Sequence, residues 1–136
     1  MGRAWLLSRD DRAIAGMSTI AIVDDDEGVC QATTSLLRSL GYRVVTFPAA
    51  EAFLKSDQLH ETSCLITDVQ MPGMSGIELQ AHLKAEAHRI PVIVMTAFPS
   101  DGVRDRAIQN GASCFLTKPF SSETLTACLD RALKTG

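Results

Sequence analysis

The chain has 136 residues and a mass of 14.7 kDa, which is the size of one compact domain. Its net charge of -3 and pI of about 5.5 argue against a direct nucleic-acid partner, because such contacts depend on clustered Lys and Arg side chains. No apolar run approaches the roughly 18 residues that cross a bilayer, so we expect no membrane partner either.

Residues 1–17 are expected to form a loosely held N-terminal extension, followed by one domain over 18–136. The apolar stretch in this extension covers only residues 4–7, which is too short for the ~7–15-residue core of a secretion signal. Two alternatives stay open. The extension could contact a partner through an amphipathic face, or it could reflect an upstream start codon included in error.

Apolar, β-rich runs alternate with stretches of helical period along the rest of the chain. Strands are predicted at 20–23, 42–47, 64–67, 92–95 and 114–116, and helices at about 27–40, 48 to 55 or 57, from 75 onward, 100–110 and from 121 onward. Five such β-α units indicate an α/β fold, with a parallel sheet that helices cover on both faces.

Local signals mark the ends of several predicted helices. Gly41 and Gly111 each follow a helix, where a glycine can adopt the left-handed conformation that stops it. Ser75, with Glu78 three residues later, fits the capping box of a helix start. These signals agree with the short connections that a repeated β-α architecture needs.

The four cysteines form no CxxC pair, and at least two of them lie in apolar runs where a thiol behaves as a small buried hydrophobe. We therefore expect reduced thiols, as is usual for a protein in the cytoplasm. A disulfide or a metal site among them stays the minor alternative. The cysteines are Cys30, Cys64, Cys114 and Cys128.

Four predicted strands end in a side chain suited to a phosphoryl oxygen or a metal ion. In an open parallel sheet all strands deliver their carboxyl ends to one edge, so these groups should converge in one crevice. They are Asp24, Asp25 and Asp26 after the first strand, Asp68 after the third, Thr96 after the fourth and Lys118 after the fifth.

The acidic run from Asp24 to Glu27 has a simple interpretation, because acids at a helix N-terminus cap free amides and interact favourably with the helix dipole. Four adjacent acids exceed what capping needs, however. Two carboxylates about 4 Å apart repel each other by roughly 4 kcal/mol at an effective dielectric of ~20 unless a cation lies between them. An oxygen-only cluster that also includes Asp68 suits Mg²⁺, which is the cofactor that we predict.

Each of the other groups is ordinary when taken alone. Asp68 could merely start a turn, but an ionised carboxylate can also attack phosphorus and form an acyl phosphate. Thr96 is a common strand residue whose hydroxyl could donate to a phosphoryl oxygen. Lys118 could be a surface lysine, or it could balance negative charge and orient a phosphoryl group. Their occurrence together at successive strand ends favours phosphoryl chemistry.

Over about residues 19–135 the chain resembles the receiver domains of two-component response regulators. The motifs that carry the resemblance are IVDDDE with Asp24 and Asp25, TDVQMPGMSG with Asp68, VMTAF with Thr96 and LTKPF with Lys118. The resemblance implies a doubly wound, five-stranded parallel sheet of the flavodoxin-like (β/α)5 type, with strand order 2-1-3-4-5. It also implies a cis peptide bond between Lys118 and Pro119.

The resemblance implies a role for each residue of the site. Asp68 would be the phosphoacceptor, contacted by Lys118 and Thr96, and Phe115 would be the switch aromatic that follows the state of the threonine hydroxyl. The implied Mg²⁺ ligands are Asp25 and Asp68 directly, Asp24 largely through water, and the backbone carbonyl of Gln70, which needs no particular side chain for that purpose.

A protein of this kind would be no enzyme for a separate substrate, but a phosphoacceptor that catalyses its own phosphorylation and dephosphorylation. The donor would be a sensor histidine kinase, a phosphotransfer protein or a small acyl phosphate. The signal would pass to a downstream effector protein through the surface of helix 100–110, strand 114–116 and the helix from 121. A homodimer is the other partner that the resemblance allows.

Two alternatives remain at this point. The segment FLTKPF looks most like receivers that precede a helix-turn-helix output domain, so the chain could be a module cut from a DNA-binding regulator, although it ends at Gly136 with no room for such a domain. A phosphohydrolase that uses an aspartyl phosphate belongs to another class. It is disfavoured because no segment would cap a substrate, and Gln70, not an acid, stands two residues after Asp68.

Overall fold

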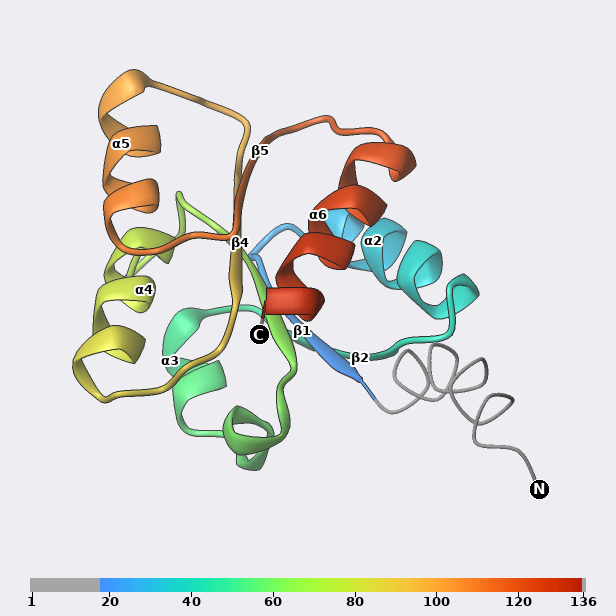
Figure 1. Cartoon of the computed structure of the whole chain (residues 1–136). Helices are drawn as coiled ribbons and strands as arrows, with labels where there is room; N and C mark the ends of the chain where they lie inside the picture. Colours follow the sequence, from blue (N-terminus) through green and yellow to red (C-terminus); the bar gives the residue numbers. More distant parts are fainter. Residues whose placement is uncertain (1–17, 136) are drawn as a thin grey trace.

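The structure, a computed structural model, describes residues 18–135. The predicted extension over 1–17 therefore lies outside the described residues. Five parallel strands form one sheet in the order β2-β1-β3-β4-β5 (Figure 1), which confirms the predicted fold. The strands are β1 (Thr19–Val23), β2 (Arg43–Phe47), β3 (Cys64–Asp68), β4 (Val92–Thr96) and β5 (Cys114–Thr117).

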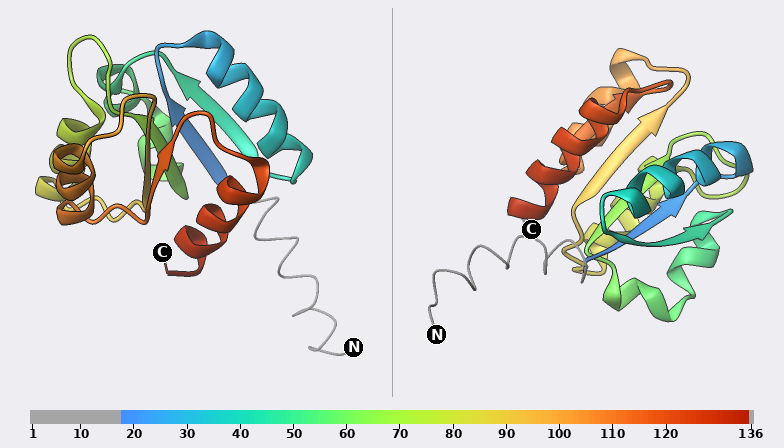
Figure 2. Two further views of the ribbon diagram at one scale, coloured as in Figure 1. Left: turned by 90° about the horizontal axis from the view of Figure 1, so that it is seen from above. Right: turned by 90° about the vertical axis from the view of Figure 1, so that its right-hand side faces the viewer.

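Helices cover both faces of the sheet (Figure 2). One face carries α2 (Glu27–Ser39) and α6 (Ser122–Thr135), and the other carries α3 (Ala50–Leu54), α4 (Gly76–Ala85) and α5 (Asp101–Gln109). A 3-10 turn, η1 (Asp57–Glu61), follows α3 in a segment where the sequence predicted only the end of a helix. Within the described residues, no helix combines the length and the apolar character that a membrane crossing needs.

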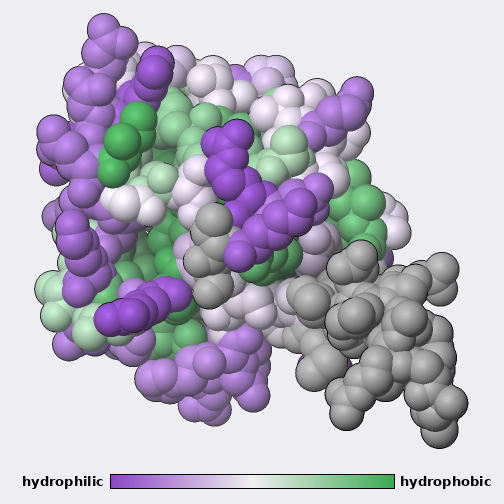
Figure 3. Space-filling view, viewed as in Figure 1, coloured by the Kyte–Doolittle hydropathy of each residue, from purple (hydrophilic) through white to green (hydrophobic). Residues whose placement is uncertain are grey.

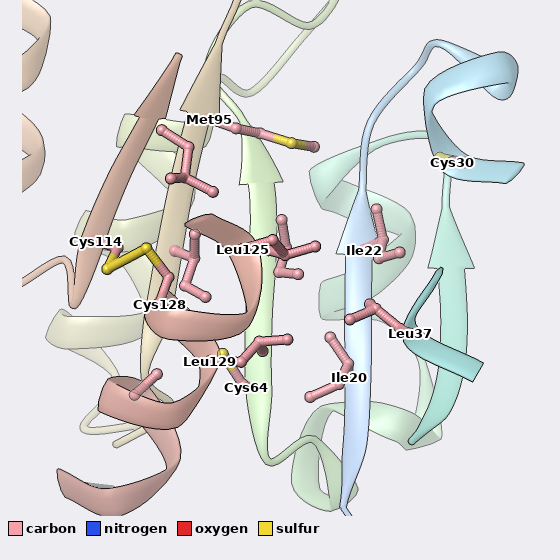
Figure 4. Close-up of a cluster of buried hydrophobic side chains, with 14 residues drawn as sticks. Ile20, Ile22, Cys30, Leu37, Cys64, Met95, Cys114, Leu125, Cys128 and Leu129 are labelled. Atoms are coloured by element: carbon pink, nitrogen blue, oxygen red, sulfur yellow. A yellow bond between two sulfur atoms is a disulfide. The ribbon is translucent and has the colours of Figure 1, made fainter. Parts of the chain in front are cut away.

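The strands at the centre of the sheet are buried on both sides. Successive residues of a strand face opposite sides, so β1 contributes to both halves of the core. Ile20 and Ile22 pack toward α2 and α6, where Leu125 joins them (Figure 4), while Ala21 and Val23 pack toward the other three helices. All five residues of β1, β3 and β4 are buried, so the groups at their carboxyl ends sit on a rigid support.

The predicted helix ends are confirmed. Gly41 and Gly111 have φ values of 96° and 89°, in the left-handed region that favours glycine. At the start of α4, the Ser75 hydroxyl accepts the Glu78 N–H at 3.1 Å, and the Ser75 N–H donates to the Glu78 carboxylate at 2.9 Å. This capping box fixes the direction in which the chain leaves the loop after β3.

Cys114 of β5 and Cys128 of α6 form a disulfide (Figure 4), so the expectation of reduced thiols is wrong for this pair. Their Cα atoms lie 5.8 Å apart, within the usual ~4.4–6.8 Å range for bonded cysteines. The two residues are 14 positions apart and form no motif, and only the packing of α6 on β5 brings them together. Cys30 and Cys64 are free and buried, as expected.

Candidate functional site

The polar groups predicted at the strand ends meet at the carboxyl edge of the sheet. Asp68 and Thr96 are the last residues of β3 and β4, while Asp24 and Lys118 directly follow β1 and β5. The strand order reverses between β1 and β3, and this is where open α/β sheets place their binding crevice. The convergence that the sequence predicted is therefore confirmed for these four residues.

Lys118 lies between two carboxylates. Its ammonium nitrogen is 2.8 Å from Oδ2 of Asp24 and 3.5 Å from Oδ1 of Asp68, and its side chain is only 15% exposed. The backbone N–H of Lys118 donates to the Thr96 carbonyl at 2.8 Å, and the expected cis peptide bond to Pro119 is present. Burial alone would lower the pKa of Lys118, but the hydrogen bond and the charges of the two aspartates outweigh burial and raise it.

Asp24 is buried, and both of its carboxylate oxygens have partners. Oδ2 accepts from Lys118, and Oδ1 accepts the N–H of Asp26 at 2.9 Å. Asp26 in turn caps α2, because its carboxylate accepts the N–H of Val29 at 3.1 Å. The capping interpretation of the acidic run is thus correct for Asp26 and leaves the other acids to be explained.

Three carboxylates form a cluster that could hold a metal ion. One oxygen each from Asp24, Asp25 and Asp68 can be chosen so that all three lie within 4.8 Å of one another. Asp25 is exposed, whereas Asp24 and Asp68 are buried. A set of donors made only of oxygen suits a hard cation such as Mg²⁺ and disfavours metals that prefer thiolate or imidazole, so these residues fit the predicted cofactor.

The carboxylate of Asp68 is held in a defined orientation. Its Oδ1 accepts the backbone N–H of Val69 at 2.9 Å and also faces Lys118. Burial and the nearby charge of Asp24 raise the pKa of Asp68, while Lys118 and the Val69 N–H oppose that rise. The positive charge of Lys118 thus favours the ionised form that a nucleophile needs.

The start of α4 packs directly against the backbone of Asp68. Gly76 approaches so closely that a Cβ atom at this position would overlap the carbonyl oxygen of Asp68. The Gly76 N–H donates to the Val69 carbonyl at 3.0 Å, and the Thr67 hydroxyl donates to the Asp68 carbonyl at 3.0 Å. The glycine of the MPGMSG segment is therefore required by a close approach of two backbones.

The side chain of Gln70 belongs to the site, although the sequence assigned a role only to its backbone. Its Oε1 accepts a hydrogen bond of 2.7 Å from the Thr96 hydroxyl. The same hydroxyl accepts the backbone N–H of Phe98 at 3.0 Å. No motif indicates this contact, because it depends on how the loop after β3 folds over the end of β4.

Phe115 lies on β5 in register with Val94 of β4, two positions before Thr96. The predicted position of Phe115 and Thr96 on neighbouring strands is therefore confirmed. Phe115 is half-buried and, like Val103 and Ala112, it packs against the buried cluster on this face of the sheet. That the Phe115 ring changes rotamer when the Thr96 hydroxyl binds a phosphoryl group on Asp68 stays a prediction.

Comparisons with known proteins place the chain among response regulators. The response regulator receiver domain family matches residues 20–130. The chain is 43% identical over 117 residues to the response regulator protein TmoT of Ectopseudomonas mendocina, covering 86% of this chain and 53% of TmoT. It is 36% identical over 115 residues to the transcriptional regulatory protein FixJ of Bradyrhizobium diazoefficiens, covering 85% and 56%. The chain thus spans about half the length of the curated relatives that it matches.

Solved structures show the same fold. The crystal structure of FixJ-N has a TM-score of 0.78 at 34% identity, over 86% of this chain and 94% of that chain. The BeF3-activated receiver domain of DrrB has a TM-score of 0.76 at 32% identity, over 87% and 98%. Because the family match covers most of the chain, this chain belongs to the response regulator receiver domain family.

Proposed function

We propose that Asp68 accepts a phosphoryl group from the phosphohistidine of a sensor histidine kinase or a phosphotransfer protein. The observation that carries the proposal is the position of Asp68 between the ammonium group of Lys118 and the acidic cluster, at the end of a buried strand. Oδ1 is held by the Val69 N–H, and we assign the attack on phosphorus to Oδ2. The new bond joins this oxygen to phosphorus, and the phosphorus–nitrogen bond of the donor breaks.

The residues that would hold Mg²⁺ are Asp25, Asp68 and the backbone carbonyl of Gln70, with Asp24 acting largely through water. Both carboxylate oxygens of Asp24 already have partners, the Lys118 ammonium and the Asp26 N–H, which supports its indirect role. When bound, the ion would neutralise charge on the transferred phosphoryl group. Lys118 and the Thr96 hydroxyl would contact phosphoryl oxygens, and the domain would catalyse its own phosphorylation and dephosphorylation.

The surface of α5, β5 and α6 is the proposed output face. A cavity of about 620 Å³ lies there, and its lining includes Arg104 and Ile108 of α5, Phe115 of β5 and Arg131 of α6. Figure 3 shows apolar side chains at the surface of this face among hydrophilic ones. We propose that phosphorylation changes this face through Thr96 and Phe115, which alters binding of an effector protein or of a second copy of the chain.

We place this activity in the cytoplasm, where the proposed kinase domain would meet its regulator. We do not favour the module of a DNA-binding regulator over this proposal, although FixJ, one of the longer relatives, is a transcriptional regulatory protein. Gln70 does not support the phosphohydrolase alternative, because its side chain binds Thr96 and provides no second carboxylate next to Asp68.

The test is intact-mass spectrometry of the chain after incubation with acetyl phosphate and Mg²⁺. We expect one added phosphoryl group in the wild type and in Asp57→Asn, which changes an exposed aspartate of η1. Asp68→Asn should gain none, since an amide is not an anionic nucleophile. Comparable labelling of Asp68→Asn, or full labelling in the presence of a magnesium chelator, contradicts the proposal.

A further inference from the structure

The hydroxyl of Thr96 is already engaged in the unmodified domain. Thr96 is 0% exposed, and its Oγ1 lies 2.7 Å from Oε1 of Gln70 and 3.0 Å from the backbone nitrogen of Phe98. A hydroxyl carries one proton and can accept through its lone pairs. Because the Phe98 N–H can only donate, the hydroxyl accepts that bond, and its own proton is the one that goes to the Gln70 amide oxygen.

This arrangement conflicts with the role that Thr96 has in the proposed function. A phosphoryl oxygen on Asp68 needs the same proton that Gln70 now accepts, and Gln70 stands only two residues after Asp68 in the chain. The hydroxyl cannot donate fully to both acceptors. Phosphorylation must therefore break the bond between Thr96 and Gln70 before the threonine can bind the phosphoryl group.

We propose that the Gln70 side chain is a positioning residue that holds Thr96 in the unphosphorylated arrangement and so opposes the phosphorylated one. The inference rests on the proposed function, because it concerns the switch of that same site. A net hydrogen bond of typical strength changes an equilibrium by about fivefold, and this is the size of the effect expected from Gln70.

The hydrogen bond between Thr96 and Gln70, which we call the tether, also affects the loop between β4 and α5. The Phe98 N–H binds the hydroxyl that Gln70 holds, while the Phe98 side chain is 73% exposed. The Gln70–Thr96–Phe98 contacts thus connect the loop after Asp68 to the segment that leads into α5. When Thr96 turns to a phosphoryl oxygen, its bond with the Phe98 N–H must adjust as well.

Gln70 can be changed without removing a proposed metal ligand. Its side chain is exposed, and the backbone carbonyl assigned to Mg²⁺ remains in any substitution. Gln70→Met keeps a similar length and volume but has only a weak sulfur acceptor in place of the amide oxygen. This variant therefore separates the hydrogen bond from the mere bulk of a side chain beside the phosphorylation site.

The experiment is a double-mutant cycle on the affinity for beryllofluoride in the presence of Mg²⁺, followed by NMR of the full chain. The four proteins are the wild type, Gln70→Met, Thr96→Ala and the double variant. Gln70→Met should bind beryllofluoride about fivefold more tightly than the wild type, because no tether has to be broken. In the Thr96→Ala background, the same substitution should change the affinity by less than about twofold.

A second readout concerns the unmodified protein. The amide resonance of Phe98 should shift in Gln70→Met without beryllofluoride, and its hydrogen exchange should speed up, because the hydroxyl that accepts this N–H is no longer held. If Gln70 acted by packing alone, the resonance of the Phe98 amide and its hydrogen-exchange rate would be the same as in the wild type.

The outcomes separate the two proposals. Equal changes in affinity in both Thr96 backgrounds would show that Gln70 acts directly on the phosphoryl group or on water, and this overturns the tether. An unchanged affinity in Gln70→Met overturns it too, while phosphorylation of Asp68 in the wild type leaves the proposed function intact. A wild type that neither binds beryllofluoride nor gains a phosphoryl group overturns both.

Discussion

The ammonium nitrogen of Lys118 lies 2.8 Å from Oδ2 of Asp24 but 3.5 Å from Oδ1 of Asp68. The main partner of the lysine in the unmodified domain is therefore Asp24, which follows β1, and not the proposed phosphoacceptor. The Asp24 carboxylate is buried, so the ammonium group of Lys118 offsets the cost of keeping this side chain away from water. Lys118 thus has a structural role before any phosphoryl group arrives.

Lys118→Met should destabilise the domain by about 3 kcal/mol, the lower end of the range for breaking a buried ion pair, because Asp24 loses its cation. Urea unfolding with and without Mg²⁺ measures this, and Mg²⁺ should restore more stability to the variant than it adds to the wild type. Lys134→Met, which changes an exposed lysine of α6, serves as the control and should stay within about 0.5 kcal/mol of the wild type. Equal losses in the two variants would contradict the role of the buried pair.

Asp25→Asn should weaken Mg²⁺ binding by at least about tenfold, because it removes a carboxylate from the proposed ligand set. Without metal the variant should be as stable as the wild type or slightly more stable, since one of three mutually repelling acids becomes neutral. Thermal melts across a Mg²⁺ titration test both parts. Asp105→Asn, at an exposed position of α5, is the matched control. A metal-induced stabilisation of Asp25→Asn equal to that of the wild type would sink the assignment.

The predictable part of this site depends on strand ends. The alternation of apolar runs and helical segments was enough to place Asp68, Thr96 and Lys118 at one edge, because the carboxyl ends of parallel strands meet there whatever the loops do. The contact between Gln70 and Thr96 depends on side-chain packing across a loop, for which the sequence carries no periodic signal.

The disulfide was missed for a related reason. Cys114 lies in a strand and Cys128 in a helix, and no sequence pattern links the two positions. Whether they pair depends on how α6 packs on β5. By contrast, the capping box at Ser75 was predictable because all of its partners lie within four residues. Local chemistry and topology could be read from the sequence, whereas contacts between loops and between layers could not.

Gly76→Ala should destabilise the domain by about 1–3 kcal/mol and slow the phosphorylation of Asp68. The added methyl group would overlap the Asp68 carbonyl, and backbone atoms cannot move aside as the end of a flexible side chain can. Gly102→Ala is the matched control, because a Cβ there meets nothing within 4 Å and the residue lies in α5. That variant should be more stable than the wild type by up to about 1 kcal/mol. Denaturant unfolding and the rate of labelling by acetyl phosphate measure the pair, and similar behaviour of both variants contradicts the close approach.

The disulfide predicts a definite count of free thiols. Protein that is purified without reductant and then unfolded should release two reactive thiols, those of Cys30 and Cys64, while protein reduced before unfolding should release four. In the folded state Cys64 should resist alkylation near pH 8, because burial raises its pKa to about 12 and leaves almost no thiolate.

Breaking the bond should also change stability. The bridge closes a loop of about the length for which chain entropy gives roughly 3 kcal/mol, so the reduced protein should unfold at a lower denaturant concentration than the oxidised protein. Cys114→Ser should match the reduced wild type and should show no further change on reduction, whereas an equally conservative Cys64→Ser variant should keep its sensitivity to reductant. Four reactive thiols in unfolded protein that was never reduced would show that β5 and α6 are held together by packing alone.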